Sequence, residues 1–219
     1  MNKYYDTLKK GNLFHNFNDI ELDDILKCIR AEIKNVKKNE VILFTGDKPL
    51  YIGIVLTGQL HVIREDYNGN SSLIATIMPG EEFAEAMCCA DIAESPVTVK
   101  AERESTFLLL NFSRLLCSCS KACSFHTKLI ENMLKLIARK NIILQNRMEI
   151  ISVKSVREKV MLYLEALAIK QGRKVTIPFN REKMADYLCV DRSALSHELM
   201  KMKKDGLIEY KKNSFNLKI

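Results

Sequence analysis

The sequence lacks any continuous apolar run long enough to cross a bilayer, and its start lacks the apolar stretch of a secretion signal. We therefore expect a cytoplasmic protein without a membrane partner. It also lacks low-complexity tracts: 47% of its 219 residues are apolar and 28% are charged, which suits two modest cores. In the cytoplasm, its seven cysteines are expected as thiols or ligands rather than disulfides.

Motifs of catalysis are missing as well. No glycine-rich phosphate loop precedes a predicted helix, no nucleophile elbow is present, and the four histidines are scattered. Glu81, Glu82 and Glu85 could be imagined as an acid–base pair, but their strand-turn context favours solvated carboxylates. The sequence therefore indicates that the protein is not an enzyme.

The last forty residues have the pattern of two short helices joined by a tight turn. Asn180 can cap a first helix over 181–188, and Asp191 can cap a second over 192–204. Apolar residues of the second helix are spaced to face inward, namely Leu195, Leu199 and Met202. Its other face carries a polar set compact enough to enter a DNA major groove: Arg192, Ser193, Ser196 and His197.

A hairpin and a charge excess accompany these helices. Gly206 ends the second helix, and 207–212 and 215–218 are predicted strands, which together make the wing of a winged helix. Residues 151–219 hold 15 Lys and Arg against 8 Asp and Glu, whereas residues 1–150 hold 19 of each. This asymmetry favours a polyanionic partner, double-stranded DNA, over a basic domain without a partner. A membrane surface is disfavoured because the apolar faces are needed for the core.

The first part of the chain alternates short apolar segments with glycine turns. A helix is predicted over 19–29, capped by Asn18 or Asp19, with apolar positions at Ile20, Leu22, Ile25, Leu26 and Ile29. Strands are predicted at 40–44, 51–56, 59–63, 72–77, 97–101 and 106–110. Many short strands indicate an antiparallel barrel or roll, in which a small ligand has room although a filled core is commoner.

A long helix is predicted over 124–151. Apolar residues recur every seven positions at Ile130, Ile137, Leu144 and Ile151, with Leu134, Asn141 and Met148 in the complementary seam. This spacing suggests a homodimer, and the alternative is that the stripe packs on its own barrel. Ser152 or Ser155 then caps a helix over 156–168 whose inner wall is Val160, Leu164 and Leu167. The fold class is therefore α+β, with a β-roll domain over 1–120, a dimerisation helix over 121–151 and a winged helix over 152–219.

This order of elements resembles the CRP/FNR family of bacterial transcription regulators across essentially the whole chain. The resemblance is most specific over 185–199 and 204–208, and in the roll it rests on 51–58 and 80–86. It implies a homodimer that binds a palindromic DNA site and contacts RNA polymerase, with an effector between the roll and the long helix.

The resemblance also implies which residues contact DNA and effector. The family's base-contacting positions fall on Arg192, Ser193 and His197, with Ser196 adjacent. Phosphate contacts or solvated surface are expected at Asn180, Arg181, Lys201 and Lys211. Candidate effector contacts are Gly80, Glu81, Phe83, Ala84, Glu85, Ala86, Ser95, Pro96, Asn141 and Gln145.

The effector segment departs from the pattern of members that bind cyclic AMP. Ala84 replaces a glycine beside Glu85, and Ser95-Pro96 replace the arginine-serine pair that holds the cyclic phosphate. A phosphate would lose a charge-assisted contact and a backbone donor there. We therefore expect that cyclic AMP does not bind, and the effector stays unidentified.

Cysteines offer a second sensing hypothesis. The first, Cys28, lies alone in a predicted helix, which argues against the N-terminal iron-sulfur cluster of the FNR branch. Three thiols and an imidazole do gather close to the start of the long helix and could hold a metal ion, hold an iron-sulfur cluster or sense redox state, or could merely pack: Cys117, Cys119, Cys123 and His126. Cys88 and Cys89 are expected to serve packing.

One rival class stays open at this stage. A basic winged helix could instead dock an acidic protein surface, with the roll as a plain scaffold. Selection from random duplexes separates the two hypotheses, because a scaffold enriches no palindrome. The sequence does not define the operator or whether transcription rises or falls.

Overall fold

The computed structural model describes residues 2–116, 124–177 and 180–218 and divides into two compact units, 1–139 and 140–219. Helix α5 (Ser124–Ser152) runs from the first unit into the second along the chain. This confirms the long helix predicted over 124–151. Among the described residues, no helix is long and apolar enough to cross a membrane.

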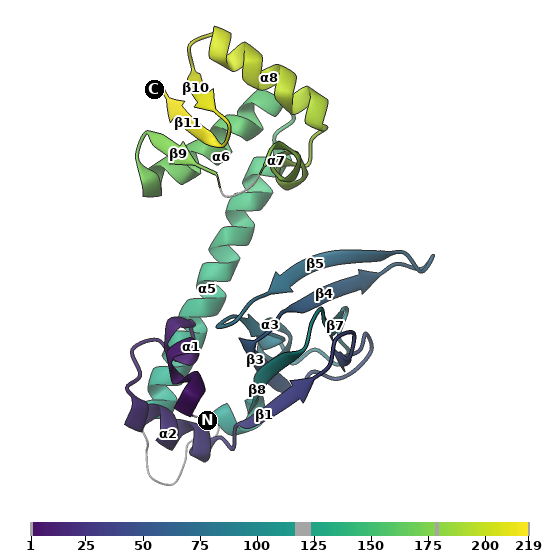
Figure 1. Cartoon of the computed structure of the whole chain (residues 1–219), viewed down its shortest axis with the longest axis vertical. Coiled ribbons are helices and arrows are strands. Elements are labelled where there is room, and N and C mark those ends of the chain that lie inside the picture. The colour runs from purple at the N-terminus through teal and green to yellow at the C-terminus, as the bar shows by residue number, and fades with distance from the viewer. Residues whose placement is uncertain (1, 117–123, 178–179, 219) are drawn as a thin grey trace. The chain divides into compact units, whose positions relative to one another are not determined.

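The first unit contains a roll of two four-stranded antiparallel sheets, which confirms the predicted fold class (Figure 1). One sheet has the order β1-β8-β3-β6, formed by Glu32–Val36, Ser105–Asn111, Tyr51–Thr57 and Glu82–Phe83. The other has the order β2-β7-β4-β5, formed by Val41–Leu43, Thr98–Ala101, Leu60–Glu65 and Ser71–Ile77. Strands β1 and β6 were not predicted, because β1 is largely polar and β6 has only two residues.

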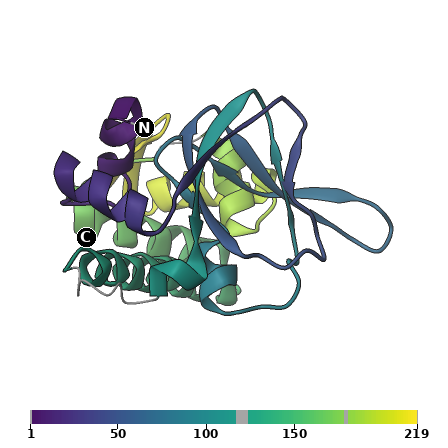
Figure 2. The same cartoon turned by 90° about the horizontal axis from the view of Figure 1, so that it is seen from below.

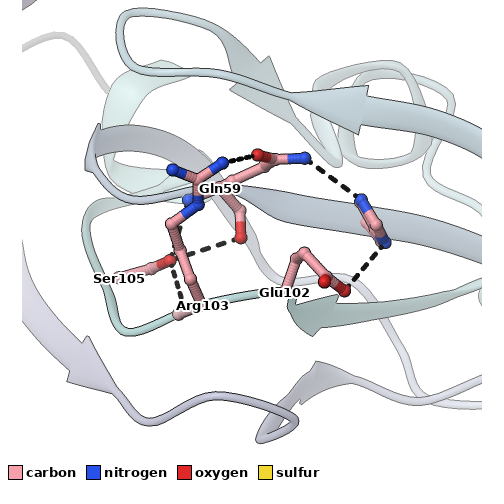
Figure 3. A network of polar contacts seen from close by, with 5 residues as sticks. Gln59, Glu102, Arg103 and Ser105 are labelled. Atoms are coloured by element: carbon pink, nitrogen blue, oxygen red, sulfur yellow. Dashed lines mark hydrogen bonds and ion pairs between the residues drawn. The ribbon is translucent and has the colours of Figure 1, made fainter.

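Two tight turns carry the chain between the sheets: residues 58–59 join β3 to β4, and residues 102–104 join β7 to β8. Polar side chains of the two turns contact each other. Gly58, in the β3–β4 turn, has a φ of +90°, and a Cβ there would lie 2.2 Å from the Ser105 Oγ. The buried Ser105 hydroxyl accepts a hydrogen bond from the Gln59 amide at 3.0 Å. Figure 3 shows Arg103 donating to the Gln59 side chain, while Glu102 belongs to the same cluster. The cluster fixes this end of the roll.

The β4–β5 hairpin projects beyond the other strands in both views of the chain (Figure 1, Figure 2). Strand β5 is the edge of its sheet, and its residues Leu73 and Ile74 are 58% and 52% exposed. The hairpin therefore contributes little to the interior of the roll.

Helices cover one sheet of the roll. They are the 3-10 helix η1 (Asn2–Tyr4), α1 (Tyr5–Lys10), α2 (Asp19–Cys28), α3 (Glu85–Cys89) and α4 (Phe112–Leu116), together with the first part of α5. Of the two predicted caps, Asn18 and Asp19, the structure has Asn18, which forms a reciprocal capping box with Glu21 at the start of α2. Ile20, expected on the apolar face of α2, is 75% exposed because it lies in the first turn, away from the core made by Leu22, Ile25 and Leu26.

The second unit is a winged helix. Helix α6 (Val156–Gln171), capped by Ser155, packs against α7 (Arg181–Leu188) and α8 (Arg192–Lys204). The unit also has a three-stranded sheet of order β10-β11-β9, formed by Ile208–Lys211, Ser214–Leu217 and Lys174–Thr176, and β9 lies between α6 and α7 in the chain. Of the predicted inner wall, Val160 and Leu164 are fully buried and Leu167 is partly buried. Strand β9 was not predicted, because it is only three residues long.

Candidate nucleic-acid interface and effector cavity

The helix-turn-helix is held by caps on both helices. The Asn180 side chain accepts a hydrogen bond from the Lys183 amide at 3.0 Å and begins α7. The Asp191 carboxylate accepts from the amides of Ser193 at 2.8 Å and Ala194 at 3.0 Å and begins α8. These bonds and the Ser193 hydroxyl lower the pKa of Asp191, with the hydroxyl as the largest cause. Both caps agree with the sequence prediction.

The outward face of α8 carries the predicted base-contacting residues, but their donors are not equally free. The Ser193 hydroxyl donates to the Asp191 carboxylate, and the Ser196 hydroxyl donates to the Arg192 carbonyl at 2.9 Å. Arg192 and His197 are exposed, and no side-chain hydrogen bond or ion pair of theirs occurs within the described part of the chain. Two donors are thus available at the first two turns of α8.

Arg181 lies differently from the other three candidate phosphate contacts. Its guanidinium lies 4.8 Å from the Tyr210 ring centroid and 4.7 Å from that of Phe215, and it donates to the Lys212 carbonyl at 3.0 Å. Burial lowers the pKa of Arg181. Arg181 therefore joins α7 to the β10–β11 hairpin through these contacts. Lys201 and Lys211, in contrast, are exposed.

An ion-pair cluster between α6 and α8 was missed at the sequence level. Arg157 Nε donates to Glu198 at 2.6 Å, and its Nη2 lies 2.7 Å from the Asp205 carboxylate. Glu198 lies beside the predicted base-contacting residues, yet this pairing turns it toward α6. The contacts join positions more than forty residues apart, so no local pattern could have revealed them.

The effector segment 80–96 is acidic. It contains five carboxylate residues and neither lysine nor arginine: Glu81, Glu82, Glu85, Asp91 and Glu94. The expectation that Glu82 and Glu85 are solvated is wrong, since they are 3% and 5% exposed. Glu82 is buried because its carboxylate accepts hydrogen bonds from the Asn12 and Leu13 amides at 3.1 and 3.2 Å. Such bonds replace the lost hydration of a buried carboxylate.

Two positions of this segment are constrained by the protein itself, Ala84 by its backbone conformation and Ser95 by an internal hydrogen bond. Ala84 has a φ of 63°, in the left-handed region that favours glycine. The Ser95 hydroxyl is 2.7 Å from the Val97 carbonyl, to which it donates, and Ser95 is 2% exposed. Gly80 has a φ of +89°, while Glu81, Ala86 and Pro96 are exposed. None of these residues offers a cation to an anionic ligand.

A cavity of about 500 Å³ opens inside the roll. Its apolar wall includes Phe83 and Phe107, whose rings meet edge to face at 5.7 Å. Lys34 and Lys48 line it too, and each forms an ion pair with a carboxylate, Glu32 at 3.2 Å and Asp91 at 3.7 Å. Of the predicted effector residues, only Phe83 and Ala84 line this cavity. Asn141 and Gln145 are exposed on the part of α5 that belongs to the second unit.

Four of the seven cysteines lie among the described residues, namely Cys28, Cys88, Cys89 and Cys189. Cys117, Cys119 and Cys123 lie outside the described residues, while His126 is 6% exposed and its Nε2 lies 4.0 Å from the Cys28 Sγ. Burial raises the pKa of the Cys88 thiol to about 12, which agrees with a packing role. Cys89 is exposed, so packing was wrong for that residue. No group of three potential metal ligands occurs among the described residues.

Comparisons with known proteins agree with this architecture. Residues 33–119 match the model of the cyclic nucleotide-binding domain, and residues 158–219 match that of the Crp-like helix-turn-helix domain. A comparison with curated proteins finds no match.

Solved structures of similar fold span nearly the whole chain. The catabolite activator protein of Thermus thermophilus is 19% identical, with 95% of this chain and 94% of that chain covered and a TM-score of 0.57. DNR of Pseudomonas aeruginosa is 17% identical, with 99% and 94% covered and a TM-score of 0.52. The c-di-GMP responsive global regulator CLP of Xanthomonas campestris is 12% identical, with 91% and 99% covered and a TM-score of 0.57.

Both domain models match in the order in which the roll and the winged helix occur, and together they cover most of the sequence. The chain therefore belongs to the CRP/FNR family of transcription regulators.

Proposed function

We propose that this regulator is a homodimer that binds a palindromic DNA site through α8 and whose activity is set by an effector at the roll and α5. In this proposal residues 1–120 sense the effector, 121–151 dimerise and 152–219 bind DNA. No catalytic step is part of it. The proposal also includes a cytoplasmic location and a contact with RNA polymerase, which the family resemblance implies.

The exposed face of α8 is the observation that carries the DNA-binding proposal. Arg192 and His197 are its two free donors, and an arginine can give two hydrogen bonds to guanine O6 and N7. Ser193 and Ser196 can still accept from a base or phosphate. The excess of seven positive charges in residues 151–219 supports binding to a polyanion. Asn180, Lys201 and Lys211 are proposed phosphate contacts, and Arg181 is proposed chiefly as support for the wing.

The exposed stripe of α5 supports the homodimer. Leu134, Leu144 and Met148 are 70%, 59% and 66% exposed, whereas the same helix packs into its own chain through Leu129, Met133 and Leu136. These three exposed side chains lie outside the core to which Leu129, Met133 and Leu136 belong. A second copy would cover the stripe, with Asn141 in the seam to fix the register.

The cavity of the roll supports a small-molecule effector. Its apolar wall and paired lysines suit a weakly charged molecule better than a cyclic phosphate, because segment 80–96 supplies no cation. The predicted contacts remain part of the proposal: Gly80, Glu81, Phe83, Ala84, Glu85, Ala86, Ser95, Pro96, Asn141 and Gln145. Metal or redox sensing at Cys117, Cys119, Cys123 and His126 remains the alternative input, testable by metal analysis and a visible spectrum of anaerobically purified protein.

Selection from random duplexes tests the DNA-binding function. We expect enrichment of a palindrome whose half-sites are one or more helical turns apart. Against the selected site, Arg192→Ala should lose about 1–3 kcal/mol of discrimination while keeping most non-specific affinity. Met200→Ala is the matched control, because Met200 is exposed on the same helix and is not among the proposed DNA contacts. If no palindrome is enriched, the rival protein-interaction module is favoured.

A further inference from the structure

Lys159 stands out because the structure places an ammonium group inside the winged helix. It lies in the first turn of α6 and is 8% exposed, and it is the one lysine classed as buried among the described residues. Val160, the next residue of α6, belongs to the core of this unit. A buried ammonium is costly unless hydrogen bonds compensate for its lost hydration.

The compensating bonds lead to the turn of the helix-turn-helix. Lys159 Nζ donates to the Leu188 carbonyl at 3.2 Å and lies 3.5 Å from the Cys189 carbonyl, which also accepts from it. Leu188 is the last residue of α7, where carbonyl groups have no partner within the helix. A cation at this end also interacts favourably with the helix dipole.

The turn itself holds an unusual backbone conformation. Cys189 has φ 52° and ψ 53°, a left-handed conformation that glycine adopts more readily. Only Cys189, Val190 and Asp191 separate α7 from α8, so the direction of α8 depends on how this turn is held. Lys159, about thirty residues earlier in the sequence, donates to the carbonyls of Leu188 and Cys189 in this turn region.

We propose that Lys159 is a positioning residue for DNA binding: its ammonium holds the turn so that α8 presents Arg192 and His197 to the major groove. This inference rests on the proposed function. The buried ammonium already donates its hydrogen bonds to backbone carbonyls. Lys159 therefore contributes to DNA affinity through the geometry of α8 rather than through a phosphate contact.

The test compares Lys159→Met with Lys201→Met in the full-length protein, using the selected duplex and an unrelated duplex at several salt concentrations. Lys159→Met should weaken specific binding about tenfold or more, leave non-specific binding within about twofold, and keep the salt slope of the parent. Lys201→Met, which removes an exposed cation, should reduce the salt slope by about one. Lys154→Met controls for the loss of charge near the start of α6.

Two further variants keep the test decisive if Lys159→Met is poorly folded. Lys159→Arg retains a cation that can donate to both carbonyls and should bind within about threefold of the parent. In the Lys159→Met background, Cys189→Gly should restore part of the specific affinity, because glycine needs less help to hold the left-handed turn. Parent-like binding by Lys159→Met, a reduced salt slope, or equal losses in the folded Met and Arg variants would overturn the proposal.

Failure of the proposed function has a different signature. In that case the parent itself enriches no duplex, and hydrogen exchange of the Ser193 and Ala194 amides still reports on the turn. Faster exchange in Lys159→Met than in Lys154→Met supports the role of Lys159 in holding α8. Equal exchange contradicts it.

Discussion

At the scale of single residues, the decisive property of a polar side chain is whether the protein already uses it. Arg192 and Ser193 are neighbours on α8, but the Ser193 hydroxyl donates to Asp191 while the Arg192 guanidinium is free of such contacts in the described structure. The same distinction applies in the roll, where the Ser95 hydroxyl is committed to the Val97 carbonyl. Residue identity alone therefore overstates the number of available contacts.

Cyclic AMP should fail to bind, because no cation lies in segment 80–96 to pair with its phosphate. We expect the Tm of the protein to be unchanged in millimolar cyclic AMP, since only a ligand that binds the folded state raises it. Thermal denaturation with and without the nucleotide measures this, and isothermal titration should give no heat of binding. A saturable rise in Tm would contradict the prediction and would place a phosphate contact elsewhere in the roll.

Arg181 should contribute to stability rather than to the salt dependence of DNA binding. Arg181→Ala removes two guanidinium–ring contacts, each typically worth about 0.5–1 kcal/mol, and the bond to the Lys212 carbonyl. We expect a lower Tm and an unchanged salt slope. Lys183→Ala, an exposed cation on the same helix, is the control and should leave the Tm unchanged. A reduced slope with an unchanged Tm would show that Arg181 contacts phosphate instead.

At the scale of elements, the start of α8 depends on Asp191, the capping residue that precedes the helix. Hydrogen bonds from the Ser193 hydroxyl and from backbone amides lower the pKa of the Asp191 carboxyl in the folded state. A depressed folded-state pKa stabilises the fold above the unfolded-state pKa, and this stabilisation disappears as the pH falls through the folded-state pKa. The cap of α8 is thus expected to be strongest at neutral pH.

Asp191→Ala should therefore lower the Tm at pH 7, and the difference from the parent should shrink steadily in acid. Thermal denaturation followed by circular dichroism between pH 7 and pH 3 measures it. Asp186→Ala removes an exposed carboxylate from the neighbouring helix α7 and should show no such pH-dependent difference. A Tm difference that stays constant with pH would mean that the ionised carboxylate is not the stabilising form.

At the scale of the whole molecule, helix α5 has one set of buried apolar residues and one set of exposed apolar residues. Leu129, Met133 and Leu136 pack in the core of their own unit, and the stripe through Leu134 and Leu144 is left exposed. Exposed leucines at heptad spacing are costly in water unless a second helix covers them. The proposed dimer gives the exposed set a partner.

The double variant Leu134→Lys, Leu144→Lys should be monomeric, with the mass of one 25.1 kDa chain in sedimentation or light scattering. Its affinity for the palindrome should fall sharply, because one copy occupies one half-site, while unfolding of the winged helix should be unaffected. Ile169→Lys, which changes an isoleucine that is 88% exposed on α6, should remain dimeric. A dimeric double variant would show that the stripe is not the interface.

Elements whose signals are local could be predicted from the amino-acid sequence. The Asp191 cap, the inward stripe of α8 and the glycine turns of the roll depend on residues a few positions apart, so their patterns can be recognised without the fold. For α2 and α6 the sequence narrowed the cap to two residues each, and the structure has Asn18 and Ser155. The winged helix and the long α5 were predicted on that basis and are confirmed.

Contacts between side chains far apart in the sequence depend on the folded arrangement of the chain. The fold buried Glu82 on the Asn12 amide, brought Cys28 to His126, turned Arg181 onto the wing and placed Lys159 beneath the turn before α8. Each of these pairs is separated by about thirty residues or more. The physical reason is that such contacts form only when packing removes water from both partners, and burial of that kind leaves no periodic trace in a single sequence.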